Sequence, residues 1–209
     1  PKRLWWIYGL INGGLLVFII NFLYADSRIG SIISLLAVAA AIVLFGNYCY
    51  QSYQQRIRKK VDEQMKISLL SVLMMLIPVI FLVVIIVLLA LSGQENISLV
   101  ISYGFIIFFG WITAIILGMT FKTLPFIVWN KVYHQLAGKG KTPSPKDLFN
   151  NTLFKYMIVI YIFGFVLFTA GILLNNTIVL QFGACSLLVT SILYNWNVIK
   201  LLIHKAVSL

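Results

Sequence analysis

Long apolar runs alternate with short polar connections along the whole chain. Six of these runs are long enough to cross a bilayer as helices, since about 20 residues span its hydrocarbon core. Their approximate bounds are 4–24, 29–50, 67–91, 97–121, 154–174 and 178–203. The pattern therefore predicts an all-α polytopic membrane helix bundle, in which residues 1–209 form a single transmembrane domain of six transmembrane helices.

Signals for helix starts and for helix packing lie at the borders of these runs or inside them. Asp26-Ser27 and Asn96 precede the second and fourth runs, where their side chains can cap the first backbone N–H groups of a helix. Small residues recur four positions apart at Gly9–Gly13 and at Ala37–Ala41. Because small residues allow membrane helices to approach closely, we expect both pairs to pack within this bundle.

Basic residues are distributed unevenly over the polar connections. Of the 16 Lys and Arg residues, all but Arg28 lie at the two termini or near the second and fourth connections, which share one side of a six-span protein. Lys and Arg resist translocation, so this side is predicted to be cytoplasmic, with both termini there. The anionic headgroups of that leaflet are the expected partners of these charges.

The composition supports this interpretation and narrows the function. With 61% apolar residues, 10% charged residues and a mean hydropathy of +1.00, the chain is far more apolar than a soluble domain. The net charge of +11 borders lipid spans, so it indicates headgroup contact and no nucleic-acid partner. Cys49 and Cys185 lie inside apolar runs without metal-ligand spacing, and we interpret them as small core residues.

The spans carry few groups that could do chemistry. No Asp or Glu lies well inside any of them, which disfavours ion-coupled transport. Motifs typical of hydrolases, nucleotide sites and zinc sites are absent from the sequence. We therefore predict no catalytic residue and no metal site from motifs, and an enzymatic role stays uncertain.

Residues 122–150 form the longest connection, which we call the elbow. Pro125 removes one backbone hydrogen bond and predicts a kink or break of the fourth helix near Phe121. Beyond it, Trp129 and Tyr133 share a face suited to headgroup depth. The candidate functional residues of the elbow are Lys122, Pro125, Trp129, Asn130, Lys131 and Tyr133.

Two interpretations of the elbow remain open. It is either a purely structural segment at the membrane interface, or a cytoplasmic-side site roofed by Trp129 and reached through Asn130, Lys131 and His134.

Farther along, Gly138–Lys141 reads as a flexible basic turn. The spacing Ser144-Pro145-Lys146-Asp147 combines an N-cap, a first-turn proline and an acidic residue, and predicts that the fifth helix begins near Pro145.

Two kinds of polar residue offer further candidate sites. His134 and His204 follow the fourth and sixth spans; imidazoles can bind heme or copper, whereas a histidine at a helix end is also often a solvated cation. A set of polar residues lies within the spans, for hydrogen bonds between helices or for a ligand cavity. It comprises Asn12, Asn21, Asn47, Thr113, Gln181, Thr190, Asn195 and Asn197.

The stretch Gly118–Trp129, with the basic turn and the proline-containing helix start after it, resembles a block in bacterial multi-span proteins related to heme-copper oxidase subunit I. NnrS-like heme and copper membrane proteins are the nearest named group, and the resemblance covers residues 118–148. It implies a bacterial inner membrane and heme as the cofactor, with His134 and His204 as candidate ligands. Asn130 and Lys131 stand where such relatives would often carry a histidine, and histidine-rich helices are missing.

The resemblance and this departure from it together favour a non-catalytic or heme-associated subunit of respiratory heme-copper oxidase-like proteins. Other membrane subunits are then its possible partners. Two alternatives remain. A small carrier or lipid-handling protein without ion coupling predicts a cavity lined by Asn47, Thr113 and Asn195, and a structural scaffold subunit predicts an exposed apolar groove that another chain occupies.

Overall fold

The computed structural model describes residues 2–25, 27–55, 63–92, 96–136 and 142–205. Almost all of these residues are helical. The elements in chain order are α1 (Lys2–Ile20), the π-helical turn η1 (Asn21–Ala25), α2 (Arg28–Gln54), α3 (Glu63–Ser92), α4 (Ile97–Phe105), the π-helical segment η2 (Ile106–Ile112), α5 (Thr113–Tyr133), the 3-10 turns η3 (His134–Leu136) and η4 (Pro145–Asp147), α6 (Asn151–Leu173) and α7 (Thr177–Leu202).

The all-α prediction is confirmed, because the described part of the chain contains six helices long and apolar enough to cross a membrane. Five of them match the predicted runs to within a few residues at each end. The fourth differs: α4, η2 and α5 form one helical segment of 37 residues, Ile97–Tyr133, which extends 12 residues beyond the predicted end at 121. The elbow therefore begins as part of the fourth of these long apolar helices.

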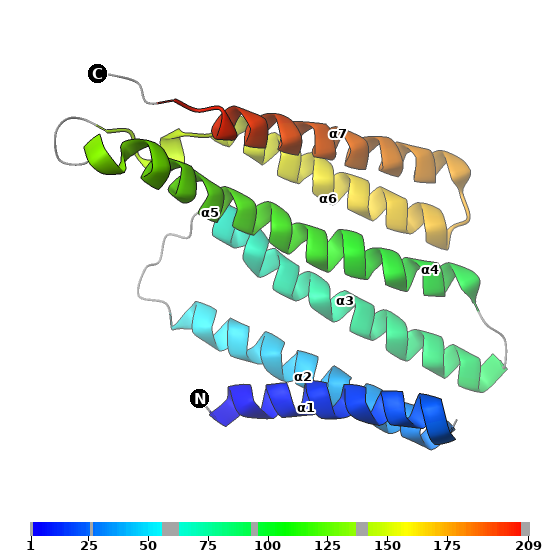
Figure 1. Cartoon of the computed structure of the whole chain (residues 1–209). Coiled ribbons are helices and arrows are strands. Elements are labelled where there is room, and N and C mark those ends of the chain that lie inside the picture. Colours follow the sequence, from blue (N-terminus) through cyan, green and yellow to red (C-terminus); the bar gives the residue numbers. More distant parts are fainter. Residues whose placement is uncertain (1, 26, 56–62, 93–95, 137–141, 206–209) are drawn as a thin grey trace.

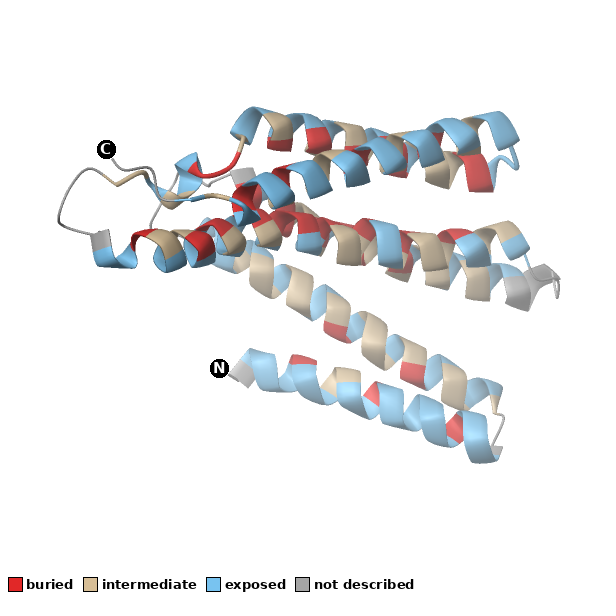
Figure 2. Cartoon of the chain, turned by 45° about the horizontal axis from the view of Figure 1, so that its top comes forward, coloured by how far each residue is buried: buried red, intermediate tan, exposed pale blue. Residues whose placement is uncertain are grey.

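The helices lie side by side, and neighbours in the sequence are mostly neighbours in space (Figure 1). The closest pairs are α6 with α7, α1 with α2, and α3 with α5. Buried residues gather in α3 to α7, whereas α1 and α2 form a peripheral hairpin that meets the rest mainly through α2 and α3 (Figure 2). α1 begins and α7 ends at the same end of the bundle, where the elbow also lies. We call this end the basic end.

Asn and Ser side chains cap several helices, as the sequence indicates. Ser27 Oγ accepts a hydrogen bond from the backbone N–H of Gly30 at 3.5 Å, and Asn96 Oδ1 accepts one from Leu99 at 3.2 Å. Both predicted caps are thus confirmed, although Asp26 lies outside the described residues. A helix start that is capped in this way has fewer unpaired N–H groups at the bundle's end.

Glycines set the closest approaches between helices. A Cβ atom at Gly171 would lie 2.7 Å from the backbone N of Leu180, and one at Gly183 would lie 2.6 Å from the backbone N of Phe168. Both contacts join α6 to α7, so this pair packs backbone against backbone. Close packing of this kind replaces the hydrophobic drive that membrane helices lack in lipid.

In the hairpin, α1 packs against α2 through Gly14, whereas the sequence predicts packing through Gly9 and Gly13. Gly14 packs against Ala37, Val38 and Ser34, and Ala41 is fully buried, so the small residues of α2 pack inside the protein as predicted. Around Gly9 and Gly13 there is open space instead, with no other atom within 4 Å of a Cβ built on either. Their predicted packing within the bundle is wrong, because α1 turns the adjacent Gly14 toward α2.

The core of the bundle extends along η2, α5 and the first half of α6. Phe121, Phe154, Met157 and Tyr161 are almost completely buried in it. The Tyr161 hydroxyl lies 2.6 Å from the carbonyl O of Phe109 and 2.9 Å from that of Gly110, so its single proton is shared between two carbonyls of η2. Tyr161 thereby ties α6 to the one segment of the long helix whose hydrogen bonds depart from the α pattern.

Candidate functional site

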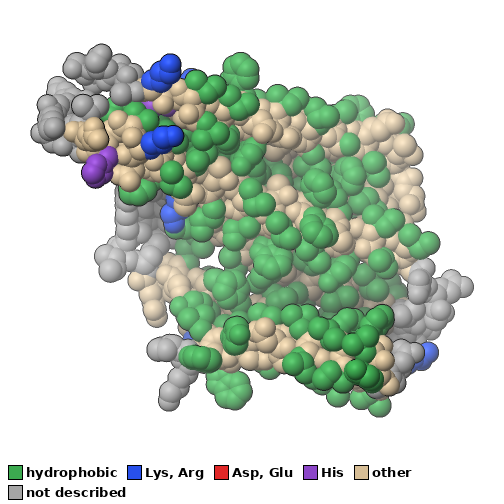
Figure 3. All heavy atoms as spheres, in the orientation of Figure 1, with side chains coloured by type: hydrophobic (Ala, Val, Ile, Leu, Met, Phe, Trp, Pro, Cys, Tyr) green, Lys and Arg blue, Asp and Glu red, His purple; other side chains and the backbone are tan. Residues whose placement is uncertain are grey.

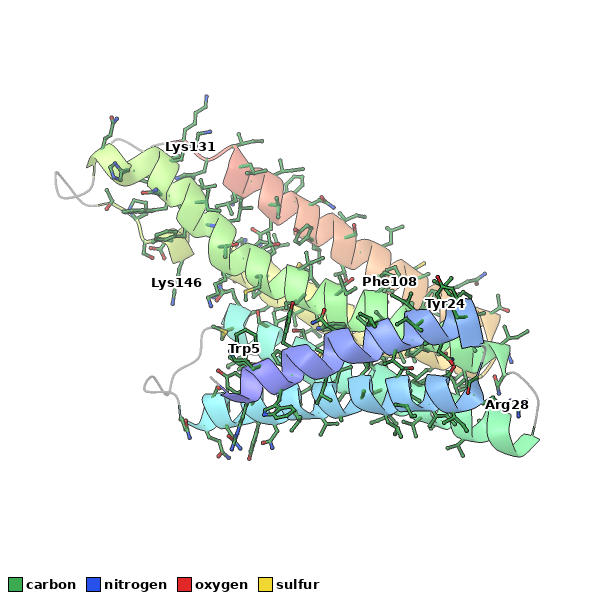
Figure 4. The ribbon with its side chains drawn as sticks, turned by 60° about the horizontal axis from the view of Figure 1, so that its bottom comes forward. Trp5, Tyr24, Arg28, Phe108, Lys131 and Lys146 are labelled. Atoms are coloured by element: carbon green, nitrogen blue, oxygen red, sulfur yellow. The ribbon has the colours of Figure 1, made fainter. Side chains whose placement is uncertain are left out.

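Lysines mark the basic end of the bundle. Lys131 and Lys146 lie there, whereas Arg28 lies at the opposite end (Figure 4). Between the two ends the surface is predominantly hydrophobic (Figure 3). The basic residues of the segment 56–60 and the basic turn Gly138–Lys141 lie outside the described residues. Lys131, Lys146 and Arg28 thus lie as the predicted charge asymmetry along the bundle axis requires.

The helix that leads into the elbow is continuous. α5 runs from Thr113 to Tyr133 with Pro125 inside it, and Phe121 and Pro125 are both buried. Of the predicted kink or break near Phe121, the break is therefore wrong, and the kink stays a prediction. Proline is tolerated within membrane helices when neighbouring elements satisfy or cover the freed backbone group, and α3 and η4 flank α5 here.

The two aromatic residues of the elbow hold its connection against the bundle. Trp129 Nε1 donates a hydrogen bond to the carbonyl O of Pro143 at 2.6 Å. Tyr133 is 1% exposed and packs in a small apolar cluster with Val128, Leu148 and Leu201. α7 and the chain after η4 cover Tyr133, and its position at headgroup depth stays a prediction. Trp129 is half-buried.

The two histidines have different surroundings. His204, just after α7, places Nε2 2.9 Å from the Tyr133 hydroxyl, with the two ring centroids 5.9 Å apart. His134 follows α5 directly and is exposed, like Asn130 and Lys131. Among the described residues, no group of three or more His, Cys, Asp or Glu side chains could hold a metal ion. The structure thus pairs His204 with Tyr133, and heme ligation by either histidine stays a prediction.

The predicted helix start at Ser144 is present, but it is only one turn long. Ser144 donates from its backbone N and its Oγ to Asp147 Oδ2, at 3.0 and 2.8 Å, and Pro145 opens the 3-10 turn η4. The long helix α6 begins six residues later than predicted, at Asn151, with Asn150 as its cap. The prediction that the long fifth helix begins near Pro145 is therefore wrong.

Asn197 holds the backbone at residue 150, directly before α6 begins. This α7 residue is 1% exposed; its Oδ1 accepts from the backbone N of Asn150 at 3.1 Å, and its Nδ2 donates to the backbone O of Asn150 at 3.1 Å. A side chain from a distant helix thus satisfies both backbone groups of the residue between η4 and α6. The carbonyl O of Asn150 also accepts the first helical hydrogen bond of α6, from the backbone N of Phe154 at 3.0 Å.

A pocket of about 260 Å³ lies between the start of α3, the middle of α5 and η4. Its walls are mainly aromatic and proline side chains, with two lysines and a few polar groups. It is lined by Gln64, Met65, Phe121, Lys122, Pro125, Phe126, Ser144, Pro145, Lys146 and Phe149. Of the six candidate elbow residues, Lys122 and Pro125 line this pocket, and Trp129, Asn130, Lys131 and Tyr133 do not.

This pocket lies beside Lys122 and Pro125 on α5, and the site roofed by Trp129 stays a prediction. The sequence did not point to Met65 at the start of α3, or to Phe149, which lies in the elbow between η4 and α6. Both residues lie beside charged connections that are predicted to share the cytoplasmic side. This shared side was the signal in the sequence that could have identified them.

The polar residues of the spans do not form one cavity. Asn21, Thr190 and Asn197 are buried, Thr113 is half-buried, and Asn12, Asn47, Gln181 and Asn195 are exposed. Asn47, Thr113 and Asn195, the expected lining of a carrier cavity, each bond within their own helical segment, and none lines the three pockets described for this chain. Cys185 is exposed and Cys49 is half-buried, so the assignment of Cys185 to the core is wrong.

Comparison of the chain with protein-family models, with curated proteins and with solved structures found no match. The resemblance over residues 118–148 therefore rests on the sequence alone. The packing of α5 against α3 explains the glycine at the start of these residues. A Cβ on Gly118 would lie 2.6 Å from Ser68 Oγ and 3.0 Å from the carbonyl O of Gln64. A glycine is needed there for α5 to approach α3.

Proposed function

We propose that this protein is a non-catalytic subunit of a larger membrane complex and that helix α1 is its docking element. The observation that carries this proposal is the outward position of Gly9 and Gly13 on a helix that packs mainly against α2. Two open glycines one turn apart leave a shallow groove into which a second helix can press its backbone.

The surroundings of the two glycines support a helix as the occupant. Trp6, Leu16 and Ile20 continue the same face along α1, and all three are exposed. Large apolar side chains on both sides of a glycine pair give a partner helix walls to pack against. We call this surface, Trp6 with Gly9, Gly13, Leu16 and Ile20, the α1 face.

The resemblance of residues 118–148 to NnrS-like and heme-copper proteins suggests the class of the partner, a heme-containing respiratory membrane protein. We place the basic end in the cytoplasm and the bundle in a bacterial inner membrane, because Lys and Arg are retained on the cytoplasmic side. Heme belongs either to the partner or, through His134 or His204, to this chain.

Native gel electrophoresis of membranes extracted in a mild detergent tests the proposal. The wild-type chain, 23.7 kDa in mass, should migrate in a complex much larger than its own detergent micelle. The double variant Gly9→Leu/Gly13→Leu fills the groove and should release the chain from this complex. Gly104→Leu is the matched control, because Gly104 on α4 also has open space around it.

The outcomes separate the alternatives. A wild-type chain that migrates alone contradicts the subunit proposal, as does a complex that survives the double variant. Optical spectra of the same bands locate the heme: a Soret band in the complex that is missing from the released chain assigns it to the partner. A Soret band that stays with the released chain and disappears in His204→Ala assigns it to this chain.

A further inference from the structure

We propose that the pocket between α2, α3 and the segment from α4 to η2 binds the ring of a membrane-soluble benzoquinone. The ring would lie inside the pocket, with its two carbonyl oxygens hydrogen-bonded to Tyr103 and Trp111, and its isoprenoid tail would extend into the bilayer. This pocket is separate from the one beside Lys122, and a single chain forms it. The inference therefore does not depend on the proposed subunit role.

The size and the walls of the pocket suit one apolar ring. Its volume is about 160 Å³, and it lies beside the middle of α2 and of α3. Most of its walls are aliphatic side chains, such as Val38 and Ala39 of α2, and no charged residue of the described chain lines it. An apolar protein cavity of about 150 Å³ can hold one benzene ring. Because the pocket is not fully enclosed, a tail can leave it for the surrounding lipid.

Two side chains that line this apolar pocket carry hydrogen-bond donors. They are Tyr103 on α4, with its hydroxyl, and Trp111 on η2, with its indole N–H. Both are half-buried, and neither donor makes a hydrogen bond within the part of the chain that the structure describes. In contrast, the Tyr161 hydroxyl and the Trp129 indole N–H both bond to backbone carbonyls.

These two donors lie on helices that are long and apolar enough to cross a membrane. In the hydrocarbon region, lipid tails offer no acceptor, so a donor without a partner is unfavourable there. A ligand that brings acceptors into the pocket would therefore gain a hydrogen bond from each of the two side chains.

The class of ligand follows from the donors and from the uncharged walls. An indole N–H can only donate, and no charge on the described walls would balance an ionised ligand, so the ligand is neutral and carries acceptors. A phospholipid or a fatty acid has its oxygen atoms at headgroup depth, and its tail brings no acceptor to the middle of α2 and α3. A benzoquinone is neutral, planar and soluble in hydrocarbon, and it carries one carbonyl oxygen on each side of its ring.

Two departures from regular α-helical structure border the pocket. Pro78 removes one backbone N–H from the hydrogen bonds of α3, and Ile107 and Trp111 belong to the π-helical segment η2. Short π-helical segments inside α-helices occur frequently at functional sites. The meeting of both irregular segments at one pocket therefore supports a binding role for it.

Native mass spectrometry of the purified full chain provides the test. The detergent-solubilised protein is titrated with decylubiquinone and, in parallel, with decylbenzene, which has a ring and the same tail but no acceptor. The fraction of ligand-bound protein gives a Kd for each, and we expect decylubiquinone to bind more tightly. Tyr103→Phe and Trp111→Phe should each weaken its binding about fivefold, the effect of one lost hydrogen bond.

Matched controls make the result specific to the pocket. Tyr156→Phe and Trp196→Phe make the same changes at exposed residues outside it and should leave the Kd unchanged. Ala39→Leu fills the pocket from α2 without removing either donor and should abolish binding, while circular dichroism checks that the helices are retained.

Three results would overturn the proposal. Equal Kd values for decylubiquinone and decylbenzene would indicate a site for any apolar molecule, such as a lipid tail. Equal effects of the two pocket variants and their exposed controls would show that the donors do not contact the ligand. Binding that persists in a folded Ala39→Leu protein would place the quinone elsewhere.

Discussion

Removal of the Tyr161 hydroxyl tests how the π-helical segment η2 is held in the core. In Tyr161→Phe, the ring stays in place, but the group that lies 2.6 and 2.9 Å from the carbonyls of Phe109 and Gly110 is lost. Tyr161 is 1% exposed, so water cannot replace the hydroxyl. The substitution therefore isolates one hydrogen-bonding group at the contact between α6 and the long helix.

The expected loss follows from the number of contacts and their burial. Hydrogen bonds between membrane helices contribute about 0.6 kcal/mol on average and up to about 1.7 kcal/mol. A carbonyl left unpaired in a buried site costs about 1–3 kcal/mol, and the π-helical backbone here has other donors that can partly compensate. We expect Tyr161→Phe to lower the free energy of unfolding by about 1–2 kcal/mol.

Unfolding of the detergent-solubilised protein by increasing fractions of SDS, followed by circular dichroism, measures this loss. Tyr156→Phe is the control, because it makes the same change on the same helix at a residue that is 64% exposed. The control should unfold at the wild-type SDS fraction. If Tyr161→Phe unfolds together with Tyr156→Phe, the hydroxyl does not stabilise η2 and the argument from the two carbonyl contacts is refuted.

Two further predictions concern the packing of α7. Asn197→Ala removes both hydrogen bonds to the backbone of Asn150 and should cost about 2 kcal/mol in the same SDS assay, whereas the exposed Asn195→Ala should change the stability by less than about 0.5 kcal/mol. Similar losses in both variants would contradict the role given to Asn197. Gly171→Ala places a Cβ about 2.7 Å from the backbone of Leu180 and should destabilise by about 1–3 kcal/mol. Gly104→Ala, where the space is open, should be tolerated, and an equally stable Gly171→Ala protein would show that α6 and α7 can separate freely.

The sequence was sufficient for the helices and for several of their ends. Six apolar runs predicted six long helices, and the caps at Ser27 and Asn96 were identified from local residues. These features depend on contacts within a few residues, which a single sequence displays directly. Even the turn opened by Ser144 and closed by Asp147 was recognisable from its spacing.

Features that depend on distant contacts were missed or misassigned. The spacing of Gly9 and Gly13 shows that α1 has a small-residue face, but it does not show which face meets α2, and the structure gives that contact to Gly14. Pro125 indicated a kink or break, and the continuous course of α5 could not be foreseen because the cover supplied by α3 and η4 is not visible in the local sequence. The pairs Asn150 with Asn197 and Tyr133 with His204 join residues 47 and 71 positions apart.

The continuous helix from Ile97 to Tyr133 has a consequence for the bilayer around it. Its 37 residues would reach roughly 55 Å at α-helical rise, against a hydrocarbon thickness of about 30 Å. The pocket between α3, α5 and η4 and the Tyr133–His204 pair both lie along this helix, so its backbone sets their height in the bilayer. In a thinner membrane this helix must tilt, or the surrounding lipids must extend along it. The position of the elbow relative to the membrane surface therefore depends on bilayer thickness.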